Sequence, residues 1–103
     1  MRDGPHPLTL RQLQYAVAVA EMLSFRKAAE RCHVSQPSLS AQLARLEGAL
    51  GLRLFERDRR RVLVTAAGGD IIGRARLILR ETDDLVEQAR RSEKGCERLC
   101  EIG

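Results

Sequence analysis

Residues 24–50 read SFRKAAERCHVSQPSLSAQLARLEGAL, and this pattern predicts two short amphipathic helices joined by a tight turn. Ser24 and Ser35 stand where the two helices begin, and a serine hydroxyl at that place accepts a hydrogen bond from an unpaired backbone N–H. Pro37 suits the first turn of the second helix, because its missing N–H costs nothing there. An apolar face of this helix, expected to be core, consists of Leu39, Leu43, Leu46 and Leu50.

The opposite face of the second helix has small, uncharged side chains. It carries Pro37, Ser40, Ala41 and Ala44, with no bulky and no acidic residue. A helix with such a face can lie close against a flat-walled partner, and the major groove of DNA accepts an α-helix in this way. The pattern therefore indicates a helix that reads DNA.

The charge of the chain is concentrated around these two helices. The 103 residues include 18 basic and 14 acidic ones, and sixteen of the basic residues are arginine, which binds phosphates and base edges in a forked geometry. Nine basic and four acidic residues lie between positions 22 and 64, whereas seven basic and eight acidic residues follow. This asymmetry is typical of a protein that binds an anionic partner at one end.

The flanking segments complete a small domain over residues 8–64. Residues 1–7 are expected to be a flexible leader, and Thr9 can cap a first helix. The expected buried stripe of that helix is Leu10, Leu13, Val17 and Ala20, with Ala16 beside it. The expected core face of the second helix, residues 25–32, is Phe25, Ala28, Ala29 and Cys32. The third helix is expected over residues 36–49, ending at Gly51.

A β-hairpin is predicted next, because residues 54–56 and 62–64 are short strand-like runs around the basic tip 58–61. Like charges at a tip repel one another, so the tip suits contact with phosphates; the alternative is a solvated charged turn. The fold class is therefore mainly α: a winged helix-turn-helix, with a three-helix core and a β-hairpin wing, followed by a long linker and dimerisation helix.

That long helix is predicted over residues 65–92, with Thr65 as its cap. Alternating spacings of four and three give a seam of Ile71, Ala75, Ile78, Thr82, Leu85 and Ala89. Ile72, Leu79 and Val86 widen the seam. The first turns of this helix are expected to fold back on their own domain. The small domain offers little surface to cover the rest, so a second copy is the expected partner there, and folding back along the whole length is the alternative. The tail, residues 93–103, has no assigned role.

The segments FRKAAERCHVSQPSLSAQLARLE and GLRLFERDRRRVLVTAAG resemble the DNA-binding domain of the LysR-type transcriptional regulators, over residues 8–89. Within that family they look most like the hydrogen-peroxide-sensing branch. The resemblance implies that a recognition helix begins with Ser35, Gln36, Pro37, Ser38 and Ser40. It also implies phosphate contacts by Arg26 and Lys27, and contacts to the minor groove or backbone by Arg57 and Arg60. Ala41 departs from the family, where arginine is frequent at this position.

The same resemblance implies a homodimer with its linker helices paired antiparallel. The two-fold symmetry of such a dimer predicts an inverted-repeat operator in double-stranded DNA. The family continues into a two-lobed effector-binding domain, and we expect this chain to lack it. The expected protein is a cytoplasmic, nucleoid-associated regulator without a cofactor or metal, able to pair also with a full-length LysR-type homologue. No apolar run is long enough to span a membrane.

Three alternatives remain open from the sequence. The winged helix could be a protein–protein interaction and dimerisation module, or the chain could be a truncated, non-functional fragment of a LysR-type regulator. Cys96 and Cys100, four residues apart, could also form a redox or metal sensor, although incidental cysteines fit better without a nearby histidine or a second pair. An enzyme is not expected, because no nucleophile–base pair or glycine-rich phosphate loop is present.

Overall fold

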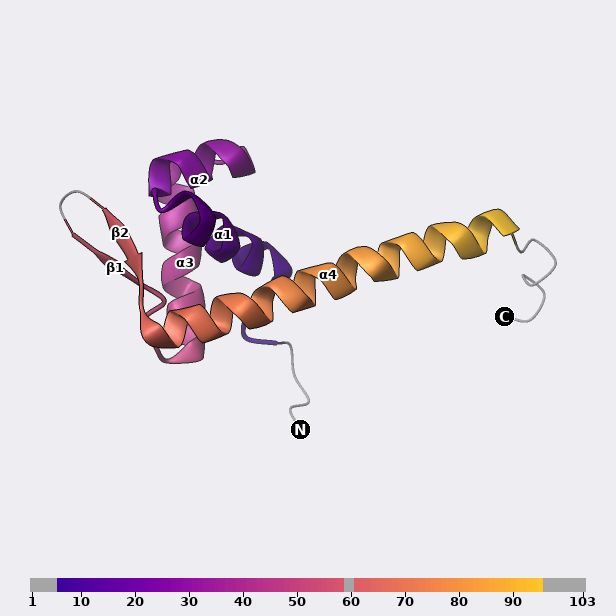
Figure 1. Cartoon of the computed structure of the whole chain (residues 1–103). Coiled ribbons are helices and arrows are strands. Elements are labelled where there is room, and N and C mark those ends of the chain that lie inside the picture. Colours follow the sequence, from indigo (N-terminus) through magenta and orange to yellow (C-terminus); the bar gives the residue numbers. More distant parts are fainter. Residues whose placement is uncertain (1–5, 59–60, 96–103) are drawn as a thin grey trace.

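The structure, a computed structural model, describes residues 6–58 and 61–95 (Figure 1). Its elements are α1 (Leu10–Met22), α2 (Phe25–Cys32), α3 (Gln36–Leu50), β1 (Phe55–Arg57), β2 (Val62–Val64) and α4 (Ala66–Gly95). The first three helices gather at one end of the molecule, the β1–β2 hairpin projects beside them, and α4 runs away as a long rod (Figure 1). This arrangement confirms the predicted winged helix-turn-helix followed by a long helix. The expected leader and tail lie largely outside the described residues.

The helices begin at the predicted caps. Thr9 Oγ1 accepts from the backbone N–H of Gln12 (3.1 Å), and the Gln12 side chain accepts in return from Thr9 N–H (3.0 Å). Ser24 and Ser35 also cap their helices: Ser24 Oγ accepts from the backbone N–H of Lys27 at the start of α2, and Ser35 Oγ accepts from that of Ser38 at the start of α3. These hydroxyls satisfy donors that have no partner inside the helix.

The core lies where α1, α2, α3 and the start of α4 meet. Leu39, Leu43 and Leu46 of α3 are at most 2% exposed, as predicted, and Leu50 lies at the edge. On α2, Phe25, Ala28 and Ala29 are buried, and Cys32 is partly buried. Most of the apolar faces predicted from spacing are thus confirmed.

The expected stripe on α1 is partly wrong. Leu10 is 44% exposed, and Val17 and Ala20 are only half-buried. The buried residues of α1 are instead Gln12, Leu13, Tyr15, Ala16, Ala18 and Val19. The reason is that α1 packs against α2, α3 and α4 together, so a broad face is buried and no single stripe describes it.

The wing is tied to α3 by a carboxylate. Glu47 Oε2 accepts hydrogen bonds from the backbone N–H groups of Leu54 (2.7 Å) and Phe55 (3.3 Å). Leu54 is fully buried, so these bonds satisfy backbone donors where water has little access. β1 and β2 pair antiparallel with Phe55 opposite Val64 and Arg57 opposite Val62. The base of the wing is therefore held at a defined place beside α3.

The turn from β2 into α4 explains the Thr65-x-x-Gly68 spacing. Thr65 Oγ1 accepts from Gly68 N–H (2.8 Å) and donates to the carbonyl of Arg53 (2.6 Å), while Thr65 N–H donates to Leu54 O (3.0 Å). A Cβ atom at position 68 would collide with the Leu54 carbonyl. Glycine at this position therefore allows the first turn of α4 to rest on the start of the wing.

The seam expected on α4 divides into two parts. Ile72 and Ala75 are 3% and 1% exposed, and Ile71 and Leu79 pack partly against the same core. This burial removes Ala75 from the seam expected for a second copy and makes Ile71 mainly an intrachain contact. Farther along, Ile78, Leu85 and Val86 are 42%, 65% and 45% exposed.

Glu21 of α1 joins three helices. Its carboxylate contacts Arg31 of α2 at 2.6 Å and Arg76 of α4 at 3.4 Å. The pKa of Glu21 lies below its ordinary value, chiefly because Arg31 donates a hydrogen bond to it, with desolvation acting in the opposite direction and the charges of Arg31 and Arg76 adding to the decrease. The network fastens α4 to α1 and α2 near the place where α4 leaves the bundle.

Candidate nucleic-acid interface

The start of α3 presents short polar side chains to solvent. Gln36, Pro37 and Ser38 are exposed in its first turn. Ser35 Oγ accepts from Ser38 N–H (3.2 Å) and donates to Ser38 Oγ (2.9 Å). Ser35 therefore acts first as the cap of the helix, whereas Ser38 keeps its own hydroxyl proton for another acceptor.

The outer face of α3 is open to a close approach. Ala41 and Ala44 are exposed, and Ser40 on the same face is half-buried. Within the described part of the chain, the Gln36 amide makes no hydrogen bond, so its donors and acceptor are available at the helix N-terminus. A glutamine at that place, followed by small residues, suits base edges in a major groove.

Arg57, at the end of β1, lies between the wing and α3. Its Cζ atom is 3.8 Å from the centroid of the Phe25 ring, and Nη2 donates to Ser40 Oγ at 3.4 Å. Phe25 in turn forms a T-shaped pair with Phe55, with the centroids 6.2 Å apart. The guanidinium of Arg57 is therefore held beside α2 and α3, because the aromatic face attracts it, although the residue as a whole is exposed.

Two shallow hollows share Phe25 and Arg57 in their walls. One, of about 280 Å³, lies between α3 and β1 and includes Ser40, Ala44 and Arg53. The other, of about 290 Å³, includes Arg26, Gln36 and Arg61. Each hollow combines arginines with an uncharged polar residue of α3 and one acidic residue, Glu47 in the first and Asp58 in the second. The arginines can bind phosphate oxygens.

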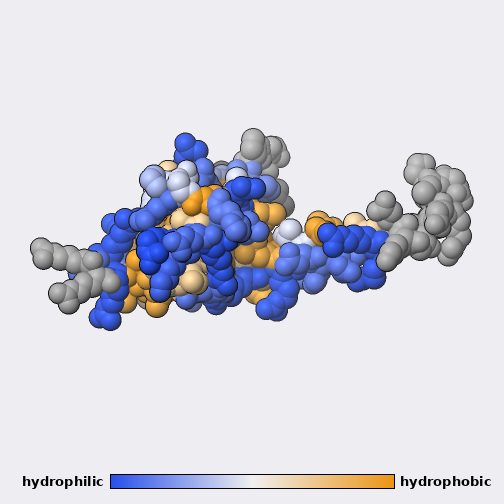
Figure 2. Space-filling model, turned by 90° about the horizontal axis from the view of Figure 1, so that it is seen from above, coloured by the Kyte–Doolittle hydropathy of each residue, from blue (hydrophilic) through white to orange (hydrophobic). Residues whose placement is uncertain are grey.

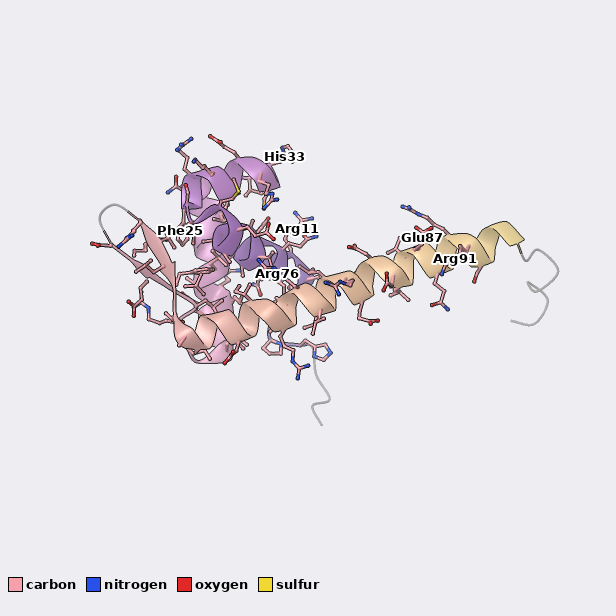
Figure 3. The ribbon with its side chains drawn as sticks, in the orientation of Figure 1. Arg11, Phe25, His33, Arg76, Glu87 and Arg91 are labelled. Atoms are coloured by element: carbon pink, nitrogen blue, oxygen red, sulfur yellow. The ribbon has the colours of Figure 1, made fainter. Side chains whose placement is uncertain are left out.

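The remaining predicted contacts lie at the start of α2 and on the wing. Lys27 is exposed, and Arg26 forms an exposed ion pair with Glu30 at 3.0 Å. An exposed pair of this kind contributes little and can exchange for a phosphate. Figure 3 shows Phe25 at the end of α2 that faces the hairpin. Arg60, by contrast, lies outside the described residues.

Sequence reasoning missed four residues at this surface. Arg53 and Arg61 line the two hollows, Phe25 supports Arg57, and Glu47 holds the wing. The basic tip was a signal for Arg61, and an acidic residue on an otherwise basic segment could have drawn attention to Glu47. The position of Phe25 on an expected core face concealed its contact with Arg57.

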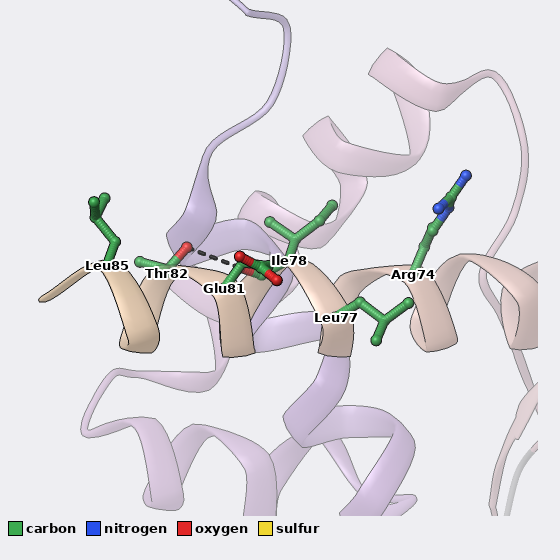
Figure 4. A pocket seen from close by; sticks show the side chains of 6 residues that line it. All are labelled: Arg74, Leu77, Ile78, Glu81, Thr82 and Leu85. Carbon is green, nitrogen blue, oxygen red and sulfur yellow. Dashed lines mark hydrogen bonds between the residues drawn. The ribbon is translucent and has the colours of Figure 1, made fainter. Parts of the chain in front are cut away.

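The projecting half of α4 forms a second surface. A shallow hollow of about 540 Å³ begins at Arg74, beside the bundle, and runs along α4 into this half; it is lined by Arg74, Leu77, Ile78, Glu81, Thr82 and Leu85 (Figure 4). Thr82 donates its hydroxyl proton to the carbonyl of Ile78 (2.9 Å), so its polar group is satisfied within the helix. Figure 2 shows apolar atoms on this rod among hydrophilic ones. The surface can therefore accept another apolar face without leaving a hydroxyl proton unpaired.

Other kinds of site find little support. Within residues 6–58 and 61–95, no group of three or more His, Cys, Asp or Glu side chains could hold a metal ion. Burial raises the pKa of the Cys32 thiol, against a smaller effect of the Arg31 charge, which makes the reactive thiolate scarcer. Cys96 and Cys100 lie outside the described residues. Of the described helices, none is both long and apolar enough to cross a membrane.

Comparison with known proteins gives consistent matches. The model of the bacterial regulatory helix-turn-helix proteins of the lysR family matches residues 10–69. The DNA-binding transcriptional dual regulator OxyR of Escherichia coli is 50% identical over 82 residues, covering 80% of this chain and 27% of that regulator. This chain therefore spans about a quarter of the length of the curated relatives that it matches.

Solved structures agree with the fold. The DNA-binding domain of BenM, crystallised with catB site 1 DNA, superposes with a TM-score of 0.82 at 40% identity, covering 85% of this chain and 98% of that one. The DNA-binding domain of CbnR, also crystallised with DNA, gives a TM-score of 0.79 at 40% identity, covering 84% of this chain and 99% of that one. In both structures the bound partner is DNA.

Proposed function

Because the chain belongs to the lysR family of bacterial regulatory helix-turn-helix proteins, a family of transcription regulators without catalytic activity, we propose that it binds double-stranded DNA sequence-specifically as a homodimer. The observation that carries the proposal is the open outer face of α3, with Gln36 at its start and the arginine-lined hollows beside it. This combination supports base readout by α3 and phosphate contacts around it.

The proposed roles follow from chemistry and position. Gln36, Pro37, Ser38 and Ser40 approach base edges and groove walls. The phosphate contacts come from basic residues on two elements, namely Arg26 and Lys27 of α2 and Arg57 and Arg60 of the wing. Ser35 keeps the start of α3 in place through its cap. The protein acts where chromosomal DNA is, in the bacterial cytoplasm.

The projecting half of α4 supports the dimer. The exposed apolar residues begin with Ile78, where α4 leaves the bundle, and continue with Leu85 and Val86, where α4 has no neighbour within the described chain. A second copy, or a full-length homologue with the same helix, would cover them. Two-fold symmetry of such a dimer implies an operator with inverted-repeat half-sites.

The proposal is tested by measuring base readout separately from charge. A duplex site is first selected by the parent protein from a random-sequence library. Gln36→Ala should then weaken binding to that site by about 1–3 kcal/mol and leave binding to scrambled DNA nearly unchanged. Gln88→Ala, on the exposed side of α4, is the matched control and should change neither. Equal losses on both duplexes would contradict readout by α3, and failure of the parent to bind any duplex would contradict the function.

A further inference from the structure

Arg57 of β1 is held by contacts from two other elements. The Phe25 ring of α2 lies under its guanidinium at 3.8 Å, Ser40 of α3 accepts from Nη2 at 3.4 Å, and β1 carries its backbone. We propose that Phe25 is a positioning residue for DNA binding, which holds Arg57 beside Ser40 so that wing and recognition helix contact DNA as one unit. This inference rests on the proposed function and deepens it.

The contacts of Phe25 show why it can hold a side chain in place. The ring is 8% exposed and is packed against Phe55, itself 3% exposed, in a T-shaped pair at an interplanar angle of 78°. Its position is therefore determined by the core and not by the solvent. An aromatic face so placed attracts a cation electrostatically and orients the planar guanidinium over it.

This arrangement leaves the binding groups of Arg57 available. Stacking occupies the flat face of the guanidinium, whereas its five N–H donors lie in the plane. One donor is used by Ser40, and the others can reach phosphate oxygens in the two hollows whose walls include Arg57. A free arginine would lose side-chain entropy on being ordered by DNA, and the stack removes part of that loss before binding.

The same contact determines how the Ser40 hydroxyl group can bind DNA. A serine hydroxyl has one donor and two acceptor sites, and Arg57 occupies an acceptor site. The hydroxyl proton of Ser40 can then be donated to DNA from the outer side of α3. Ser40 is thus assigned the role of a donor toward an acceptor such as a purine N7 or a phosphate oxygen.

The test is a double-substitution cycle on DNA binding. Affinity for the duplex selected by the parent protein is measured for Phe25→Leu, Arg57→Ala and the combined variant. We expect Phe25→Leu to weaken binding about tenfold when Arg57 is present, because the substitution removes one cation–π contact and the ordering of Arg57 that depends on it. When Arg57 is alanine, Phe25→Leu should have little further effect on binding. Phe25→Tyr keeps the ring and should bind like the parent.

Three measurements keep the test independent of folding. Thermal melting shows whether each variant is folded. Ser40→Ala removes the other partner of Arg57 without changing the core. It should weaken DNA binding severalfold when Arg57 is present, and by a smaller factor when Arg57 is alanine. In the DNA-free parent, the Arg57 side-chain N–H resonance should show a ring-current shift that Phe25→Leu abolishes.

The outcomes separate the inference from the function. If the parent binds its duplex but Phe25→Leu costs the same affinity with and without Arg57, Phe25 acts only through the fold and the inference is overturned. Absence of the ring-current shift in the parent would overturn it as well. Failure of the parent to bind any duplex would overturn the proposed function, and this inference with it.

Discussion

The two halves of α4 have the same sequence pattern and different surroundings. In the first half, Ile72 and Ala75 are buried against the bundle, and Glu21 pairs with Arg76. In the second half, Leu85 and Val86 are 65% and 45% exposed. Figure 3 shows Arg76 where α4 passes α1, and Glu87 and Arg91 on the part that has left the bundle. A regular apolar repeat therefore predicts a helix with a partner, without saying whether the partner is the same chain.

The two halves of α4 contribute to different properties of the protein, namely folding and association. The first half contributes to the stability of the domain, since it buries apolar surface within one chain. The second half contributes only when another molecule covers it, because its apolar side chains otherwise remain in water. Substitutions in the first half should thus change unfolding, and those in the second half should change association.

The largest expected effect comes from Ile72→Ala in the buried half. Ile72 is 3% exposed, so removing its side chain should lower the free energy of unfolding by about 3 kcal/mol through lost burial and a residual cavity. Leu85→Ala, in the projecting half, is the matched control and should change the unfolding of the dilute protein by less than about 0.5 kcal/mol. Urea denaturation at low protein concentration measures both, and similar losses would contradict the division of α4.

Gly68→Ala should have the next largest effect. The added Cβ would collide with the Leu54 carbonyl. The backbone of residue 68 fixes the position of this Cβ and the carbonyl is itself backbone, so the main chain must shift. We expect a loss of about 2 kcal/mol of unfolding free energy. Gly69→Ala meets nothing within 4 Å and should stabilise the helix by about 0.5–1 kcal/mol. Thermal melting of the pair gives the sign of each effect, and a stabilised Gly68→Ala would show that α4 does not rest on the wing.

Residues whose role depends only on their neighbours in sequence could be predicted from the sequence. Thr9, Ser24, Ser35 and Thr65 all cap helices as expected, since capping depends only on a hydroxyl and nearby N–H groups. The leucine face of α3 was equally clear, because Leu39, Leu43 and Leu46 recur at helical spacing. These signals were sufficient for the fold, and they placed the start of α3 in the candidate interface.

Residues with several neighbours were not predictable in the same way. The buried face of α1 was misplaced because three helices cover it. The direction of Arg57 was missed because its rotamer depends on Phe25 and Ser40, which are 32 and 17 residues away in sequence. The division of the seam at Ala75 depends on how far the bundle extends along α4. Such features follow from tertiary contacts and not from spacing.

Ile78→Asp should weaken association rather than folding. Ile78 is 42% exposed and lines the hollow on α4, so the substitution places a charge where the second copy is proposed to pack. We expect the dimer dissociation constant to rise at least about tenfold, equivalent to 1.4 kcal/mol. Leu63→Asp puts the same charge on an equally apolar residue of the wing, 45% exposed, and should leave the dimer intact. Sedimentation at micromolar concentration distinguishes the variants, and a monomeric parent would contradict the dimer.

The smallest expected effect concerns the charge that fastens the first half of α4. The folded-state pKa of Glu21 is lowered, mainly by the Arg31 hydrogen bond, so its ionised form stabilises the fold above the unfolded-state pKa, and this contribution is lost as pH falls through the lower folded-state value. Because the carboxylate side chain is 38% exposed, the contribution should be only about 0.5 kcal/mol. Glu21→Gln should therefore be less stable than the parent by that amount at about pH 7, and the difference should shrink toward about pH 3. Glu87→Gln, on the projecting half, should show no comparable change, because that part of α4 has left the bundle. Urea denaturation across this range measures both differences, and a Glu21→Gln deficit that persists at low pH would mean that Glu21 acts through packing instead of charge.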